Sequence, residues 1–116
     1  MGKLTTHVLD LTNGRPARGM RVELRRIVDD RDELVTGATT NADGRTDAPL
    51  LTGEAFATGR YRLSFLVGEY FAAASVADAG AFLDVVPIDF LVTDTAASYH
   101  VPLLVTPWAY STYRGS

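Results

Sequence analysis

Two histidines are the side chains of this sequence that are best suited to moving protons near neutral pH. The 116-residue chain contains no others besides His7 and His100, and imidazole titrates where general acid–base catalysis is most effective. Each lies in a segment with strand character, and either one alone is more simply a hydrogen-bonded or surface histidine of a strand. If the first strand shares a sheet with the last two, both imidazoles can converge on one face.

An arginine completes a possible catalytic set. Arg45 directly follows the sequence NADG, a tight turn in which Gly44 can adopt positive φ at little cost. The ordinary fate of such an arginine is exposure to solvent, but a fixed cation there could also hold a carbonyl group or an anion. Arg114, near the C-terminus, competes for the same role, so the residues alone indicate a His/His/Arg site without deciding its cation.

Other kinds of site find little support. The chain contains no cysteine, which excludes disulfides and thiolate metal sites, and two histidines without an acidic cluster make a weak metal site. It contains no HExxH pair, GxSxG elbow or Gly-rich phosphate loop. A Ser–His–Asp triad is compatible with the composition, although no local motif indicates one.

Charge and hydropathy restrict the partners and the location. The net charge is −3, and the absence of a basic stripe argues against nucleic-acid binding. No apolar run is long enough to span a membrane, and the segment MGKLTTHVLD lacks the apolar centre of a signal peptide. We therefore expect a cytoplasmic protein that does not bind membranes.

Short apolar segments separated by turn residues predict an all-β fold. The expected strands cover residues 4–11, 20–28, 34–40, 60–67 and 84–92, with two more in residues 99–116 joined near Thr106 and Pro107. Pro87 inside its strand predicts an edge or a bulge. The one expected helix covers the alanine-rich residues 69–80 and ends at Gly80. We predict one domain, residues 1–116, that forms a two-sheet antiparallel sandwich of Greek-key type with about seven or eight strands.

Four stretches carry a resemblance to a known family. They are TTHVLD at residues 5–10, NADGR at 41–45, YHVPLLVTP at 99–107 and the terminal YSTYRGS at 110–116. Together they resemble the 5-hydroxyisourate hydrolase branch of the transthyretin-like family, over essentially the whole chain. The final YRGS is the most diagnostic stretch, because the transthyretin carriers lack it. Ser98 and Asp89 depart from the family pattern, which often has a histidine and a basic residue at these places.

The resemblance implies an activity and a set of site residues. It implies hydrolysis of 5-hydroxyisourate, in urate breakdown, to 2-oxo-4-hydroxy-4-carboxy-5-ureidoimidazoline, with no metal and no cofactor. The implied catalytic residues are His7, Arg45, His100 and Ser116. The implied substrate-binding residues are Arg45, Tyr113, Arg114, Gly115 and Ser116. It also implies a homotetramer with active sites between dimers, where Trp108 and Tyr110 would be buried in an interface.

Two alternatives to the enzyme stay open at this point. One is a non-catalytic transthyretin-like carrier of a small ligand, and the other is a structural sandwich without a small-molecule site. In the carrier Tyr110 and Tyr113 would serve strand packing, which tyrosine favours in any case. The joint presence of His7, Arg45, His100 and YRGS favours the hydrolase, while leaving open which histidine is the general base.

Overall fold

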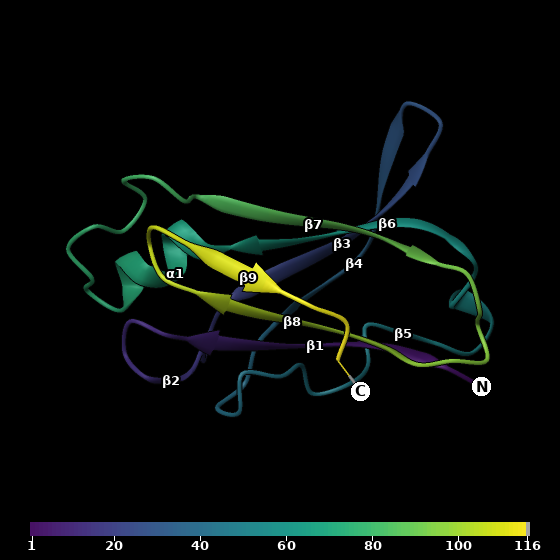
Figure 1. Cartoon of the computed structure of the whole chain (residues 1–116), viewed down its shortest axis with the longest axis horizontal. Coiled ribbons are helices and arrows are strands. Elements are labelled where there is room, and N and C mark those ends of the chain that lie inside the picture. The colour runs from purple at the N-terminus through teal and green to yellow at the C-terminus, as the bar shows by residue number, and fades with distance from the viewer. Residues whose placement is uncertain (116) are drawn as a thin grey trace.

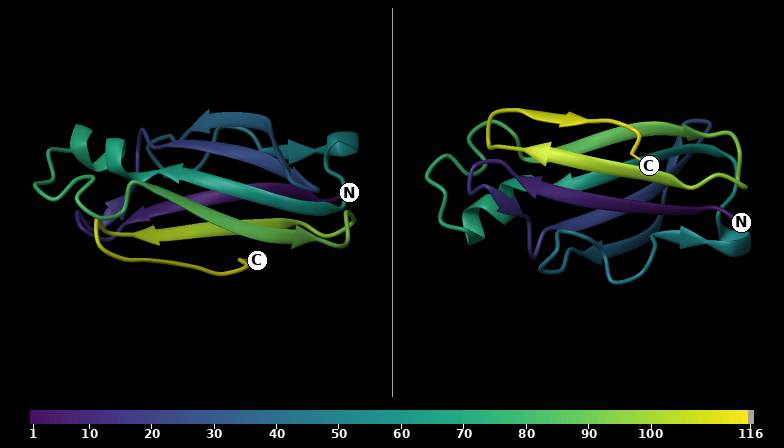
Figure 2. Two further views of the ribbon diagram at one scale, coloured as in Figure 1. Left: turned by 90° about the horizontal axis from the view of Figure 1, so that it is seen from above. Right: turned by 60° about the horizontal axis from the view of Figure 1, so that its bottom comes forward.

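The computed structural model describes residues 1–115, which form two β-sheets packed against each other with a short helix at one end (Figures 1 and 2). The first sheet has the order β2-β1-β8-β9, and β5 also pairs with β1. The second sheet has the order β4-β3-β6-β7. The two-sheet sandwich predicted from the sequence is thereby confirmed.

The element bounds are as follows. The first sheet contains β1 (Lys3–Asp10), β2 (Arg15–Pro16), β5 (Leu51–Thr52), β8 (Tyr99–Val105) and β9 (Tyr110–Thr112). The second contains β3 (Arg21–Val28), β4 (Arg31–Thr39), β6 (Gly59–Leu66) and β7 (Val85–Val92). A 3₁₀-helix, η1 (Gly53–Ala55), precedes β6, and the α-helix α1 (Val67–Ala73) follows it directly.

Alternation along the strands builds the core. Successive side chains of a strand point to opposite faces of the sheet, and in β1 every second residue from Leu4 to Asp10 is buried. β6 buries Tyr61, Leu63 and Phe65 in the same way. The alternating faces of these strands thus separate the core from solvent, and the opposite face of β1 carries Thr5 and His7.

The pairing of β1 with β8 departs from the antiparallel expectation. All other strand pairs described in residues 1–115 are antiparallel, but β1 and β8 run parallel, with Thr5 opposite His100 and His7 opposite Pro102. In Figure 1 the purple β1 and the yellow-green β8 lie side by side along the lower sheet. This pairing joins the first long strand of the chain to the last.

The helix ends earlier than the sequence indicates. Its C-cap is Ala74 rather than a residue near Gly80, because Ser75 adopts a left-handed φ of 59°. The amides of Ser75 and Val76 then donate to the carbonyls of Ala72 and Phe71, which is the Schellman pattern that usually employs glycine. Because serine occupies the position where glycine usually marks the end of a helix, the sequence does not indicate this end.

Two further local expectations have different outcomes. The connection between the strands expected at residues 20–28 and 34–40 is a turn of only Asp29 and Asp30, because β4 already begins at Arg31. Pro87 was expected near an edge, and β7 is indeed an edge strand of its sheet. No helix in residues 1–115 is long and apolar enough to cross a membrane.

A buried carboxylate fastens the end of β1 to α1. Asp10 is fully buried and accepts hydrogen bonds from the Asn13 backbone amide at 2.9 Å, the Asn13 side-chain amide at 2.7 Å and the Tyr70 hydroxyl at 2.6 Å. These three bonds compensate for the loss of water around the charge. Asp10 therefore holds both the loop after β1 and the first turn of α1.

The core of the sandwich predicts a clear difference between two leucines. Leu103→Ala in β8 removes a side chain with 0% exposure, so we expect unfolding free energy to fall by about 2–5 kcal/mol. Leu91→Ala removes a leucine that is 52% exposed on β7, and we expect a change within about 0.5 kcal/mol. Urea denaturation of both variants measures the difference, and equal losses would contradict the assigned core.

Candidate active site

The parallel pairing of β1 and β8 brings the two histidines together. The imidazole rings of His7 and His100 are tilted by 32° with centroids 6.4 Å apart, and both side chains are half-buried. The expectation that the two rings converge on one face of the sheet is confirmed. A small molecule or a water placed against this face can contact both imidazoles.

Thr5, which was not among the residues predicted for the site, lies against one of these rings. Its Oγ1 lies 2.8 Å from His100 Nδ1, across the β1–β8 pairing in which the two residues stand opposite each other. The hydroxyl can donate to an unprotonated Nδ1 or accept from a protonated one. Either way, Nε2 of His100 is the nitrogen left for other chemistry. The available signal was spacing, because Thr5 precedes His7 by two residues on the same strand face.

A tight turn presents Arg45 beside His7. The turn is closed by the Asn41 amide donating to the Arg45 carbonyl at 2.8 Å and the Gly44 amide donating to the Asn41 carbonyl at 2.9 Å. Gly44 adopts a φ of 74°, and a Cβ on it would collide with the carbonyl oxygen of Val8. Val8 in turn donates its amide to Gly44 at 2.8 Å, and Arg45 forms an isolated bridge with His7. Glycine is therefore required here for both conformation and close approach.

Burial and the nearby guanidinium keep both imidazoles neutral. Burial lowers the pKa of His7, Arg45 lowers it further, and the Asp43 backbone and carboxylate oppose these effects. Burial also lowers the pKa of His100, and the positive charges of Arg45 and His7 act in the same direction. Two unprotonated imidazoles beside a fixed cation can accept a proton and stabilise a developing negative charge.

A pocket opens in front of His100. Its volume is about 450 Å³, within the range of roughly 300–1,000 Å³ that is typical of small-molecule sites. It is lined by Lys3, Thr5, Thr6, Arg45, Thr46, Asp47, Ala48, Pro49 and His100. Lys3 and the segment 46–49 were not among the expected site residues. Within residues 1–115, no group of three or more His, Cys, Asp or Glu side chains is arranged to hold a metal ion.

Gly115, near the C-terminus, lies against His100. The Gly115 amide donates to the His100 carbonyl at 2.8 Å, and a Cβ on Gly115 would lie 2.5 Å from His100 Cδ2. Only a glycine therefore fits in this position without moving the imidazole. Gly115 thus approaches the site through its backbone.

Arg114 and Tyr113 point elsewhere. The Arg114 guanidinium lies 4.1 Å from the centre of the Tyr99 ring and donates to the Ser98 carbonyl at 3.2 Å, which fixes the terminal segment to β8. Neither Arg114 nor Tyr113 lines the pocket in front of His100, so their role as substrate ligands stays a prediction. Ser116, the last expected site residue, lies outside the described residues.

Comparison with known proteins gives a consistent set of relatives. A family model described as the HIUase/Transthyretin family matches residues 4–115. The chain is 54% identical over 113 residues to 5-hydroxyisourate hydrolase of Deinococcus radiodurans, covering 97% of this chain and 95% of the relative. The solved 5-hydroxyisourate hydrolase of Klebsiella pneumoniae has 35% identity and a TM-score of 0.83 over 100% of both chains.

A longer solved protein contains a similar domain. The structure of an (S)-allantoin synthase matches with 46% identity and a TM-score of 0.92. The match covers 99% of this chain but only 44% of the synthase. The present chain therefore spans less than half the length of that protein.

The electrostatics of the site predict coupled titration. Arg45→Gln removes a charge that lowers the pKa of both histidines, so both pKa values should rise, although not to the ordinary value of about 6.5 because burial remains. NMR titration of the ring C–H signals measures the shifts. Arg60→Gln, on β6 of the other sheet, is the matched control. Unchanged histidine titration in Arg45→Gln would contradict the site geometry.

Proposed function

We propose, because the chain belongs to the HIUase/transthyretin family, that it is an enzyme that hydrolyses 5-hydroxyisourate. The product is 2-oxo-4-hydroxy-4-carboxy-5-ureidoimidazoline, and the reaction is a step in purine catabolism by way of urate. The observation that carries this proposal is the pair of neutral imidazoles, 6.4 Å apart, beside the pocket that Arg45 lines. The full-length similarity to named 5-hydroxyisourate hydrolases supports the choice of substrate.

The histidines supply the proton transfers of the reaction. One unprotonated imidazole removes a proton from water as its oxygen attacks a ring carbonyl carbon of the substrate. The tetrahedral intermediate collapses, the carbon–nitrogen bond of the six-membered ring breaks, and an imidazolium returns a proton to the leaving nitrogen. Acid–base assistance of this kind contributes about 10²- to 10⁴-fold in rate. The lowered pKa values of His7 and His100 keep the base form populated at neutral pH.

Arg45 acts on charge and orientation. Arg45 lines the pocket together with His100, and its backbone is held by the closed turn at residues 41–45. It can therefore offset the negative charge that develops on the attacked carbonyl oxygen without having to reorganise. A preorganised donor of this kind lowers the barrier by roughly 3–4 kcal/mol.

The C-terminal residues close the same site in this proposal. Gly115 lies against His100 through its backbone. We propose that Ser116, the next residue of the sequence, hydrogen-bonds the substrate or the attacking water. Arg114 anchors the terminal segment on Tyr99, and a direct contact of Tyr113 and Arg114 with the substrate stays a prediction.

The carrier alternative uses the same fold but not the same residues. A carrier needs a channel lined for affinity, and it has no use for two unprotonated imidazoles beside an arginine. The hydrogen bond between the Thr5 hydroxyl and Nδ1 of His100 also holds this imidazole in one orientation, as proton transfer requires. The geometry therefore favours an enzyme over a non-catalytic carrier.

A homotetramer is the assembly that we propose for the chain. Trp108, Tyr110 and Tyr113 are 54%, 44% and 61% exposed, and exposed aromatic side chains on and around the edge strand β9 are suited to burial between subunits. The edge strands β7 and β9 can also extend their sheets by pairing with a second copy. A cytoplasmic location and a single domain over residues 1–116 stay predictions.

The activity itself is the first test. Purified protein should accelerate the disappearance of freshly made 5-hydroxyisourate, followed by ultraviolet absorbance, well beyond its spontaneous decay. His100→Asn should lower kcat/KM by about 10²- to 10⁴-fold because it removes an acid–base group. Circular dichroism serves as the control for folding. No acceleration by the unaltered chain at neutral pH would refute the enzyme, and full activity of His100→Asn would refute the assigned role.

Thr5 is proposed as a positioning residue, and two substitutions separate this role from simple packing. Thr5→Val keeps the shape but removes the hydroxyl that lies 2.8 Å from His100 Nδ1, so kcat should fall about three- to tenfold, the worth of one net hydrogen bond, with little change in KM. Thr5→Ser keeps the hydroxyl and should restore most of kcat. Equal losses in both variants would assign Thr5 to packing alone.

A further inference from the structure

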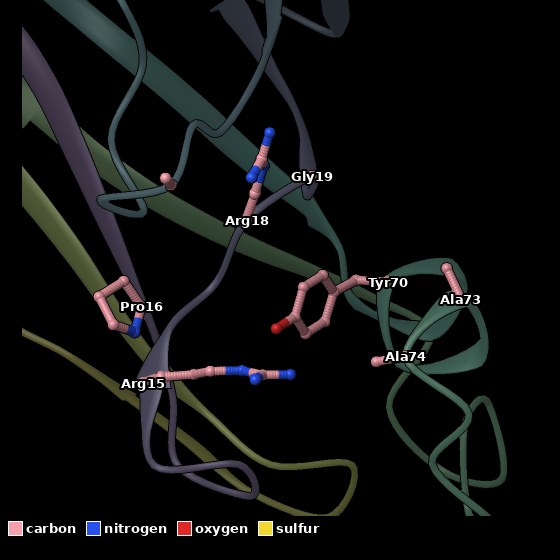
Figure 3. A pocket seen from close by; sticks show the side chains of 8 residues that line it. Arg15, Pro16, Arg18, Gly19, Tyr70, Ala73 and Ala74 are labelled. Atoms are coloured by element: carbon pink, nitrogen blue, oxygen red, sulfur yellow. The ribbon is translucent and has the colours of Figure 1, made fainter.

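A second pocket lies near the end of the sandwich that carries α1 (Figure 3). Its volume is about 530 Å³, somewhat larger than the pocket in front of His100, and the two share no lining residue. Its wall comes from β2 and the following loop on one side and from α1 and its C-cap Ala74 on the other, and Ala42 also lines it. The reaction proposed above makes no use of this pocket.

Two arginines that form no ion pair among the described residues line it. Arg15 belongs to β2 and Arg18 to the loop before β3. The ion pairs found within residues 1–115 use Arg21, Arg25, Arg31 and Arg62, but neither of these two. No acidic residue lines the pocket. Two arginines thus line one hollow of a chain whose net charge is −3. In Figure 3 the Arg15 side chain extends past the Tyr70 ring toward α1, whereas the Arg18 side chain points away from the ring.

Tyr70 adds no charge of its own. Burial, together with the hydrogen bond to Asp10, raises the pKa of Tyr70 far above neutral pH, so its hydroxyl stays protonated. Asp10 itself is fully buried and already accepts three hydrogen bonds. It therefore does not offer its oxygens to the pocket, and Arg15 and Arg18 set the charge of the opening.

The rest of the wall is apolar. Pro16, Ala42, Ala73 and Ala74 present short hydrophobic side chains, and Tyr70 contributes the face or edge of its ring. Such a surface favours a flat apolar group, whereas guanidinium groups favour carboxylates, which they can bind through two parallel hydrogen bonds. The wall is therefore suited to a ligand that carries both a flat apolar group and a carboxylate.

We propose that this pocket binds a small carboxylate that carries a ring, with the carboxylate held by Arg15 and the ring against Tyr70, Ala73 and Ala74, while Arg18 adds positive charge at the edge of the pocket. The ligand would also touch Ala42, which belongs to the same turn as Arg45. The proposal does not depend on the hydrolase activity, since none of its residues lines the other pocket.

Binding of benzoate to the ¹⁵N-labelled full chain tests this proposal by NMR. Benzoate should produce saturable shifts of the backbone amides of Gly19, Ala42, Ala73 and Ala74, which line the pocket. Benzamide has the same shape without the charge, and inorganic phosphate has charge without the ring. Both should bind at least about tenfold more weakly, because each lacks one of the two contacts.

Single substitutions locate the charge requirement. Arg15→Gln should weaken benzoate binding by about tenfold, the effect of losing one charge-assisted hydrogen bond. Arg18→Gln should weaken it by a smaller factor, of about threefold, because Arg18 acts through its charge at the edge of the pocket. Arg60→Gln also removes one exposed arginine, but it lies on β6 and does not line the pocket. It should change affinity by less than about twofold, since salt screens distant surface charges.

Several results would overturn the proposal. No saturation up to roughly 10 mM benzoate would mean that no formed site exists. Benzamide or phosphate binding as tightly as benzoate would remove the requirement for a ring carboxylate. An equal loss in Arg60→Gln, or shifts centred on His100 instead of Ala42, would attribute binding to general charge or to the other pocket.

Discussion

The parallel register of β1 and β8 is the constraint on which the rest of the site depends. It places Thr5 opposite His100 and brings the centroids of the two imidazole rings to 6.4 Å. Each histidine also forms a bridge with a residue outside the β1–β8 pair. Arg45 bridges to His7 on one side, and Gly115 bridges to His100 on the other. Because side chains alternate along a strand, a slip of one residue in β1 would turn His7 into the core and Val8 out of it. The hydrophobic core thereby protects the geometry of the polar face.

One strand serves both purposes at once. The inward face of β1 carries Leu4, Val8 and the buried Asp10, and its other face carries Thr5 and His7. The Asp10 carboxylate accepts a hydrogen bond from the Tyr70 hydroxyl at 2.6 Å, so the same strand also positions α1 against the sheet. The two pockets on either side of the turn at residues 41–45 are therefore tied to a common element, although they share no lining residue.

Local patterns in the sequence predicted what depends on local physics. The alternation in β1 and β6, the edge position of Pro87 and the tight turn before Arg45 all follow from neighbouring residues. The parallel partner of β1 lies 95 residues away for the pair Thr5 and His100, and nothing in either segment specifies it. The contribution of Thr5 was hidden for the same reason, because a threonine in a strand is ordinary until the ring beside it is known. The early end of α1 was missed because Ser75, a poor glycine substitute on conformational grounds, adopts the left-handed φ.

The arginines show how charge is divided between structure and ligand binding. Arg21, Arg25 and Arg62 pair with acidic side chains of the same or neighbouring elements, and such exposed pairs contribute little more than local order. Arg45 has no such partner within residues 1–115, and it lines the pocket beside His100. Arg60 also lacks a partner there but lines neither pocket, so the missing partner alone does not identify a binding arginine. Arg15 and Arg18 meet both conditions, as Arg45 does. Like Arg45, these two arginines are therefore suited to a negatively charged group in the pocket that they line. The second pocket has an apolar wall at α1 in place of histidines, which indicates ligand binding instead of proton transfer.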